Sequence, residues 1–228
     1  MDYVIGASSD WHLDLPGNLC KKVNGSFHVI GCKDQLSLER LEEINPRYVF
    51  FPHWSYIIEP KVYDNFECII FHMTDVPFGR GGSPLQNLIS RGIYDTKITA
   101  LRCEGGIDAG PVYMKQPLSL YGSAQEIYMR AGRVIEDMIV SIVQEEPKPV
   151  PQSGEVIEFP RRKPAESDIA KISNLDQVFD YIRMLDADNY PKAFFETAQL
   201  RFEFSRASRK INHVVADVRI TLKDGNEK

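Results

Sequence analysis

Long apolar stretches are missing from this sequence of 228 residues. It contains no run of about 18 apolar residues, the length needed to span a membrane. Its first residues, MDYVIGASSDW, lack the basic segment and apolar core of a secretion signal. Basic charge is also not in excess, since 27 Lys and Arg against 32 Asp and Glu give a formal net charge of −5. We therefore expect a cytoplasmic protein that binds no membrane and has no general electrostatic attraction to nucleic acid.

Cysteine is scarce and has no metal-binding spacing. The four cysteines, Cys20, Cys32, Cys68 and Cys103, form no C-x-x-C pair. The last three lie in apolar, strand-like runs, where reduced cysteine behaves as a small hydrophobic residue. The five histidines show no zinc-site spacing either. These patterns predict a reducing compartment and no metal site.

Short apolar runs rich in β-branched and aromatic residues alternate with helical patterns. The predicted strands cover residues 2–6, 27–32, 47–51, 66–71, 97–103 and 112–118. Predicted helices cover 37–44, a segment with Ser83 as N-cap, Pro84 at its first position and Gly92 as its stop, and a long helix that opens with a Ser123–Glu126 capping box. This alternation predicts an α/β fold of three layers with a mostly parallel sheet.

A Pro-rich stretch, EEPKPVPQSG (145–154), ends the long helix. A short strand (155–159), a basic turn (160–168), a helix from about Asn174 to Leu185 and strand-like residues 193–204 follow. We expect residues 1–150 to form the main, catalytic domain and residues 151–228 to form a small C-terminal α+β subdomain.

The stretch FHMTDVPFGRGGSP (71–84) carries the first candidate for chemistry. His72 leaves a predicted strand at its carboxyl end, where parallel α/β sheets bind ligands. Asp108 lies in the glycine-bracketed loop CEGGIDAGP, after the predicted strand 97–103. If adjacent strands carry the two residues, the carboxylate can orient and charge-stabilise the imidazole. The alternative is a core histidine that is hydrogen-bonded to the backbone.

The rest of this stretch offers donors to an anionic ligand. Its glycines and Arg80 lead into the helix at Pro84, so backbone N–H groups and a guanidinium are at hand. Alternatively, the stretch is a flexible connection that needs glycine for positive φ angles.

The order of these pieces resembles the formyltransferases that use 10-formyltetrahydrofolate. The family pattern is a strand, His-x-Ser/Thr, a Pro-containing loop, R-G-x-x-P, a helix, and D-A-G after a later strand. The matching residues here are His72, Thr74, Pro77, Arg80, Gly81, Pro84, Asp108, Ala109 and Gly110. YVFFPHWSYII (48–58) is similar to the family's folate-pocket strand and loop. RRKPAESD (161–168) and IRMLDADNYPKAFF (182–195) look like the tail of the tRNA- and sugar-directed members, so the resemblance covers about residues 45 to 195.

The resemblance implies a formyltransferase-like, Rossmann-related domain that transfers a formyl group from 10-formyltetrahydrofolate to an amine. It gives His72 the role of base or oxyanion stabiliser, with Asp108 orienting it and Thr74 beside it. The implied cofactor-binding residues are Phe51, Pro52, His53, Trp54, Tyr56, Ile57, Ile107 and Asp108.

One position departs from the family pattern. The family usually has Asn two residues before the His, and this chain has Ile70. Isoleucine cannot donate a hydrogen bond to an oxyanion, and loss of such a donor typically costs about 10²- to 10³-fold in rate. Either protonated His72 takes over this role with help from a backbone N–H, Thr74 or His53, or the chain binds folate or a nucleotide sugar without catalysing.

Three acceptors remain open. Methionyl-tRNA members carry a larger, basic C-terminal domain, and glycinamide ribonucleotide members stop after the long helix. A nucleotide-linked amino sugar fits this acidic chain best, with UDP-4-amino-4,6-dideoxy-N-acetylaltrosamine, on a side branch of pseudaminic acid synthesis, as the suspected type. The substrate-binding candidates are Asp75, Arg80, Gly81, Gly82, Arg161, Arg162, Lys163 and Tyr190.

The tail is also rich in aromatic residues. Phe194, Phe195, Phe202 and Phe204 either bury the seam of a homodimer or close the C-terminal subdomain.

Overall fold

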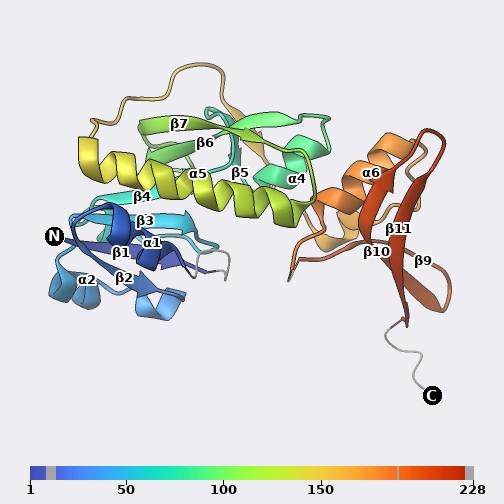
Figure 1. Ribbon diagram of the computed structural model, residues 1–228, viewed down its shortest axis with the longest axis horizontal. Helices are drawn as coiled ribbons and strands as arrows, with labels where there is room; N and C mark the ends of the chain where they lie inside the picture. The colour runs from blue at the N-terminus through green and yellow to red at the C-terminus, as the bar shows by residue number, and fades with distance from the viewer. Residues whose placement is uncertain (9–13, 189, 224–228) are drawn as a thin grey trace. The chain divides into compact units, whose positions relative to one another are not determined.

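The computed structural model describes residues 1–8, 14–188 and 190–223 (Figure 1). The chain divides into two compact units. The first unit contains residues 1–81, 96–118 and 129–158, and the second contains 82–95, 119–128 and 159–228. The expected domain boundary between residues 150 and 151 remains a prediction, since the second unit also takes in two stretches that precede it.

A six-stranded sheet, in the order β2-β1-β3-β4-β6-β7, forms the centre of the fold. β1 pairs in parallel with β2 and β3, β3 pairs in parallel with β4, and β4 pairs antiparallel with β6. The expected α/β class with a mostly parallel sheet is confirmed. The strands are β1 (Asp2–Ala7), β2 (Ser26–Ile30), β3 (Tyr48–His53), β4 (Cys68–His72), β6 (Asp95–Arg102) and β7 (Val112–Ser119).

The central strands are apolar on both faces because both faces are covered. Residues 3–6 of β1 and 48–52 of β3 are buried, as expected for parallel strands between helical layers. On one face, Val4, Val49 and Phe51 pack with Leu41 and Val62 from two helices. The burial of this sheet fixes the position of the residues that follow β3 and β4.

Two of the helices are capped by side chains at their N-termini. In α2 (Leu38–Ile44) Ser37 accepts a hydrogen bond from the backbone N–H of Arg40. In α5 (Ala124–Glu145) the Ser123 N–H donates to Glu126 Oε2 over 2.7 Å, and the Glu126 N–H donates to Ser123 Oγ over 3.3 Å. The capping box is confirmed. The sequence did not predict α1 (Leu15–Lys22), α3 (Pro60–Tyr63) or the short 3₁₀ turn η2 (Lys33–Gln35).

The helix after the His72 loop, α4 (Pro84–Ile89), belongs to the second unit. Ser83 occupies the N-cap position but its side chain does not cap the helix. Ser83 has a φ of 46°, and its hydroxyl accepts the Arg162 N–H over 3.1 Å. The expected stop is present, since Gly92 has a φ of 72°.

The rest of the second unit packs α6 (Leu175–Met184) against a three-stranded antiparallel sheet of order β11-β10-β9. The predicted start of this helix at about Asn174 is confirmed, and Asn174 caps α6 by accepting the Asp176 N–H over 2.7 Å. The strand-like residues 193–204 divide between β9 (Ala193–Glu196) and β10 (Leu200–Arg209), and β11 (Val214–Leu222) was not predicted. The 3₁₀ turn η3 (Pro164–Ser167) precedes α6.

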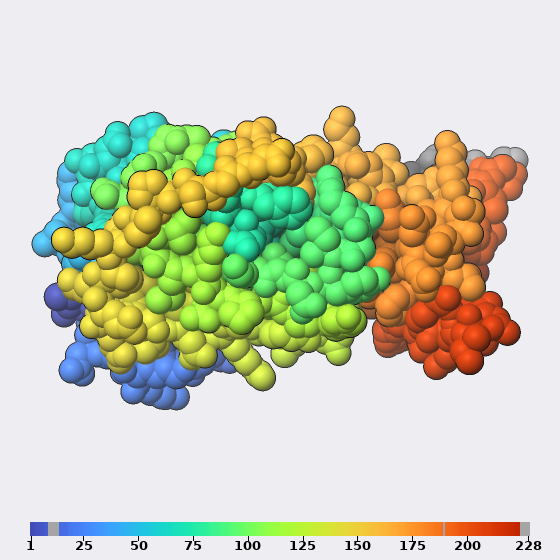
Figure 2. Space-filling view, turned by 90° about the horizontal axis from the view of Figure 1, so that it is seen from above, coloured from blue at the N-terminus to red at the C-terminus, as the bar shows by residue number. Residues whose placement is uncertain are grey.

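Residues 146–156, here called the crossing segment, run from the end of α5 to the short strand β8 (Ile157–Phe159). Figure 2 shows this yellow-to-orange segment lying across the surface over green and teal residues. Val112 and Val150 exchange two backbone hydrogen bonds of 2.7 and 2.8 Å, and the Ile157 N–H donates to the Pro77 carbonyl over 3.2 Å. β8 pairs with β5 (Phe78–Gly81), the strand that continues the His72 loop. The crossing segment is therefore held at Val150, within it, and at Ile157, just after it.

Candidate active site

His72 and Asp108 meet in the first unit. His72 ends β4 and is 8% exposed. Its Nε2 lies 2.8 Å from the Gly79 carbonyl oxygen, and its Nδ1 lies 3.4 Å from Asp108 Oδ2. Since a carbonyl oxygen only accepts, Nε2 carries a proton in this arrangement. Nδ1 is the ring nitrogen that faces the carboxylate.

The route by which Asp108 reaches His72 differs from the expected one. β6 runs antiparallel to β4, so its carboxyl end, at Arg102, lies opposite Ile69, whereas His72 lies opposite Thr99. The carboxyl ends of β4 and β6 therefore lie at opposite edges of the sheet. The sequence-based prediction had placed them at the same edge. The loop 103–111 itself returns Asp108 to the imidazole.

Backbone constraints hold this loop in place. Asp108 has a φ of 49°, in the left-handed region that few residues other than glycine adopt. At Gly110, a Cβ would lie 1.8 Å from the Arg102 carbonyl oxygen, so any side chain would clash with the backbone. Asp108 Oδ2 also accepts the Gly81 N–H over 2.8 Å. The carboxylate thus lies between an imidazole and a backbone amide.

Thr74 is fully buried and its hydroxyl already has a partner. It donates to the Gly79 carbonyl over 3.1 Å, and the Thr74 carbonyl accepts the Thr99 hydroxyl over 2.7 Å. In this structure Thr74 therefore holds the turn that faces His72. Its expected catalytic role remains a prediction.

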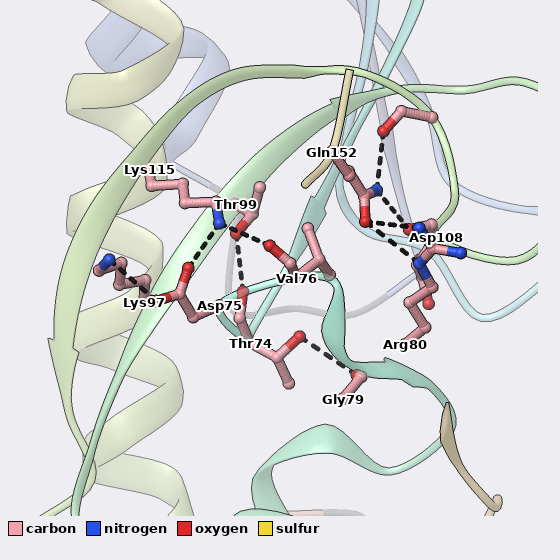
Figure 3. Close-up of polar contacts among 11 residues, drawn as sticks. Thr74, Asp75, Val76, Gly79, Arg80, Lys97, Thr99, Asp108, Lys115 and Gln152 are labelled. Atoms are coloured by element: carbon pink, nitrogen blue, oxygen red, sulfur yellow. Dashed lines mark hydrogen bonds and ion pairs between the residues drawn. The ribbon is translucent and has the colours of Figure 1, made fainter. Parts of the chain in front are cut away.

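Arg80 contacts a residue that the sequence analysis missed, Gln152 of the crossing segment (Figure 3). Arg80 Nε and Nη2 donate to Gln152 Oε1 over 3.1 and 2.8 Å. Gln152 Nε2 donates in turn to the carbonyl oxygens of Asp108 and Gly110, both over 2.8 Å. Nothing in the pattern of a Pro-rich stretch marks one glutamine for such a position.

Asp75, expected to bind substrate, contacts two lysines (Figure 3). Its carboxylate lies 2.8 Å from Lys97 Nζ and 2.5 Å from Lys115 Nζ, and Lys115 also donates to the Val76 carbonyl. Burial acts to raise the pKa of Asp75, but its hydrogen bonds to Lys115 and Lys97 outweigh burial and hold that pKa below its ordinary value. These ion pairs and the Lys115–Val76 hydrogen bond hold the start of the loop that follows β4 in place.

The expected cofactor-binding residues fall into two classes. Phe51 and Pro52 are buried in the sheet core, whereas Tyr56, Ile57 and Ile107 are exposed. His53 ends β3, and burial lowers its pKa. Apolar side chains left in solvent, as at these three positions, can cover a flat aromatic ligand.

Trp54 has a buried donor with no partner in the described residues. Its ring lies 5.4 Å from that of Phe51 and 5.3 Å from that of Tyr56, centroid to centroid. Its indole Nε1 is buried and makes no hydrogen bond within the described part of the chain. Such an unmet donor is uncommon in a native structure and marks a place where a ligand acceptor can bind.

The remaining substrate-binding candidates lie in the second unit. They are Gly82, Arg161, Arg162, Lys163 and Tyr190. A Cβ on Gly82 would lie 2.6 Å from Arg161 Cα, so glycine is required there for packing. Arg162 donates to the Glu166 carbonyl over 2.6 Å, and the Lys163 N–H donates to the Glu166 carboxylate over 2.5 Å. Burial raises the pKa of Tyr190. Their proposed contact with a substrate stays a prediction.

Ile70 occupies the face of β4 that His72 shares, two residues earlier. It is half-buried and packs against the apolar cluster that contains Phe51 and Cys68. Its environment suits an aliphatic side chain, and it offers no donor to the site.

Across the described residues, no three His, Cys, Asp or Glu side chains gather in a way that could hold a metal ion. Among the described helices, none combines the length and apolar character needed to cross a membrane. All four cysteines are free thiols.

Two hollows lie away from His72. One of about 540 Å³ is in the second unit, between residues of α6 and the β9–β11 sheet, and one of about 390 Å³ is in the first unit, beside α1 and the end of α5. Neither is lined by His72 or Asp108.

Comparison with known proteins shows similarity to formyltransferases. The family "Methionyl-tRNA formyltransferase, C-terminal domain" matches residues 164–221. A methionyl-tRNA formyltransferase of Clostridium botulinum is 26% identical over 172 residues, which are 72% of this chain and 55% of that relative. This chain thus spans about half the length of that relative. The solved "Methionyl-tRNA formyltransferase from Clostridium thermocellum" is 46% identical with a TM-score of 0.94, over 97% of this chain and 99% of that one.

More distant solved structures share the fold. A sugar N-formyltransferase from Shewanella is 15% identical with a TM-score of 0.71, over 93% of this chain and 99% of that one. The formyltransferase PseJ from Anoxybacillus kamchatkensis, solved with a UDP-linked formamido sugar and tetrahydrofolate, is 16% identical with a TM-score of 0.57, over 70% of this chain and 85% of that one. At these identities the likeness concerns the fold alone.

Proposed function

The chain belongs to the methionyl-tRNA formyltransferase family, and on this premise we propose that it transfers a formyl group from 10-formyltetrahydrofolate to a primary amine. The observation that carries the proposal is the His72–Asp108 contact of 3.4 Å, close to the backbone amide of Gly81. It brings together a proton-accepting group and the carboxylate that can orient it.

The residues after β3 fit a folate. The unmet Trp54 Nε1 can donate to an acceptor on a pterin ring, and Tyr56, Ile57 and Ile107 can cover its apolar faces. When bound, 10-formyltetrahydrofolate supplies the formyl group and a leaving nitrogen.

His72 is the group proposed to handle the proton that the acceptor amine loses. Imidazole is the side chain best suited to take up and release protons near neutral pH. Asp108 stabilises the positive charge that the ring gains. Because Nε2 is bonded to the Gly79 carbonyl, His72 must exchange this bond for one to the substrate in order to act.

With Ile70 in place, stabilisation of an oxyanion falls to the protonated ring of His72 or to a backbone N–H. The Thr74 hydroxyl donates to Gly79, which argues against it as the main donor. This assignment is part of the proposal.

For the acceptor, we propose a nucleotide-linked amino sugar. The net charge of −5 gives little attraction to a polyanionic tRNA. Methionyl-tRNA is the second candidate, because the relative that is 46% identical bears that name. The proposed compartment is the cytoplasm, which suits four free thiols.

The test incubates the protein with 10-formyltetrahydrofolate and a panel of amines. The panel contains UDP- and dTDP-linked 4-amino sugars, glycinamide ribonucleotide and methionyl-tRNA, and mass spectrometry detects the gain of one formyl group. Formylation of a nucleotide sugar supports the proposal, and formylation of methionyl-tRNA alone overturns the acceptor. Tight binding of folate with no product from any amine would instead support a binding protein.

Variants test the roles of the two residues. We expect His72→Asn and Asp108→Asn each to abolish transfer without unfolding the protein. The matched controls are His28→Asn and Asp2→Asn, which break a comparable His–Asp contact of 2.9 Å elsewhere in the first unit. Full activity in either site variant would refute the assigned roles.

A further inference from the structure

The contacts of Gln152 use the whole side-chain amide. Two N–H donors point to the carbonyls of Asp108 and Gly110, and the oxygen accepts two N–H groups from Arg80 (Figure 3). An amide of this kind has two donors and two acceptor lone pairs. All four are satisfied, so the side chain is held in one orientation. If the amide were flipped, its N–H groups would face the N–H donors of Arg80, and its oxygen would face the carbonyl oxygens of Asp108 and Gly110.

These bonds join segments that are distant in the sequence. The Arg80–Gln152 contact spans 72 residues, and the Asp108–Gln152 contact spans 44. The crossing segment brings Gln152 to the site and is itself fixed by Val150 on one side and Ile157 on the other. Gln152 thus presents a fixed amide to a loop whose own conformation is unusual.

The loop needs such support at Asp108. A φ of 49° at a non-glycine residue is disfavoured and persists only where surrounding contacts hold it. Gln152 bonds the carbonyls of Asp108 and Gly110, on both sides of Ala109, and so fixes the backbone that carries the carboxylate. The carboxylate is then set 2.8 Å from the Gly81 amide and 3.4 Å from His72 Nδ1.

We propose that Gln152 is a positioning residue of the active site: it holds the Asp108 carboxylate against His72 and holds the Arg80 guanidinium beside it, without touching the reacting atoms. This inference rests on the proposed function. It predicts that loss of Gln152 lowers kcat by about 10- to 100-fold, the scale of a small misplacement of reacting groups. KM for 10-formyltetrahydrofolate should change much less, since none of the hydrogen bonds of Gln152 is with Trp54, Tyr56, Ile57 or Ile107, the residues proposed to contact the pterin ring.

Two variants of similar length separate the donors from the acceptor. Gln152→Met removes all four hydrogen bonds, whereas Gln152→Glu keeps acceptors for Arg80 but sets a carboxylate against two carbonyl oxygens. If the hydrogen bonds from Gln152 to the carbonyls of Asp108 and Gly110 support catalysis, both variants should have a lower kcat than the wild type. Activity retained in Gln152→Glu alone would overturn the role at Asp108. Gln35→Ala is the matched control, because Gln35 accepts one N–H, from Gly31, at an exposed turn of the same unit.

A measurement without substrate tests the same inference. The Gly81 amide donates to Asp108 Oδ2, so release of the carboxylate should speed hydrogen exchange at Gly81 by about tenfold or more in Gln152→Met. Exchange at Val49, whose amide donates to the Glu67 carbonyl in the core, should not change. Unchanged exchange at Gly81 would overturn the positioning role even if no acceptor were found. Faster exchange at Gly81 together with unchanged kcat would show that the hold is irrelevant to transfer.

A double-mutant cycle completes the test. If Gln152 acts through Asp108, Gln152→Met should not speed hydrogen exchange at Gly81 any further in an Asp108→Ala background, where the carboxylate that accepts the Gly81 N–H is absent. Additive effects on this exchange would mean that Gln152 acts by another route. A wild-type protein inactive with every amine would refute the proposed function, while the exchange result at Gly81 would still stand.

Discussion

At the scale of single residues, Asp75 gives a pH-dependent contribution to stability. Its pKa is lower in the folded protein than the ordinary value of 3.8, because hydrogen bonds from Lys115 and Lys97 outweigh the effect of burial. A carboxylate with a lowered pKa adds stability above its unfolded pKa, and this stability is lost as the pH falls through the folded pKa. We expect Asp75→Asn to lower Tm at pH 7, by an amount that shrinks below about pH 4.

The side chain of Asp75 is 41% exposed, so the effect at neutral pH should be on the order of 1 kcal/mol or less. Thermal unfolding at several pH values between 3 and 7 measures it. Asp34→Asn, at an exposed position of the same unit, is the control and should show no such trend. A gap between wild type and Asp75→Asn that stays constant down to pH 3 would contradict the lowered pKa.

The residues of the site were only partly predictable. The meeting of His72 and Asp108 could be proposed because one follows an apolar run and the other lies in a loop rich in glycine. Gln152, Lys97 and Lys115 could not, because their contacts join segments 72, 22 and 40 residues apart and polar side chains in loops and exposed strand positions follow no period. The roles of Thr74, Arg161 and Tyr190 remain predictions.

At the scale of elements, the loop between β6 and β7 depends on one glycine. A Cβ at Gly110 would lie 1.8 Å from the Arg102 carbonyl oxygen, whereas a Cβ at Gly105 meets nothing within 4 Å. We expect Gly110→Ala to displace the loop and lower kcat at least about tenfold, since Asp108 moves with it. Gly105→Ala is the matched control and should retain activity. Steady-state kinetics on both variants check this, and equal activity would show that the loop can shift without disturbing Asp108.

The strands of the main sheet could be predicted, but their directions could not. Six runs matched β1, β2, β3, β4, β6 and β7, because short runs rich in β-branched and aromatic residues between turn signals are typical of strands. The apolar character of a run does not indicate in which direction the strand runs, so the antiparallel orientation of β6 relative to β4 was not predicted. β11 alternates apolar and polar residues from Ala216 to Leu222, which is a strand pattern, but the predicted strands ended at residue 204 and did not include it.

At the scale of the whole molecule, the second unit leaves part of a sheet face uncovered. β11 is an edge strand, and among the described residues it pairs with β10 alone. Val218, Ile220 and Leu222 lie on one face of it and are 49%, 53% and 56% exposed. The same face carries Phe202, opposite Ile220. An exposed edge beside apolar side chains favours pairing with another strand.

The sequence of β11 fits a second copy of itself. In an antiparallel pair of two β11 strands centred on Val218, Asp217 lies opposite Arg219 of the second copy, and Arg219 lies opposite its Asp217. Ala216 and Val214 then lie opposite Ile220 and Leu222 of the other strand. Both faces are therefore complementary, with opposite charges on one and apolar residues on the other. We predict a homodimer formed through β11.

Charge exchange within β11 tests this register. Asp217→Arg places two positive charges opposite each other at both ends of the pair, and Arg219→Asp places two negative ones, so each change should weaken the dimer at least about tenfold. The double change Asp217→Arg with Arg219→Asp restores both opposite-charge pairs and should recover the dimer. Sedimentation equilibrium measures the dissociation constants, and Tm shows whether loss of the Asp217–Arg206 contact has unfolded the unit. A monomeric wild type would exclude the dimer, and a double variant no stronger than either single one would exclude this register.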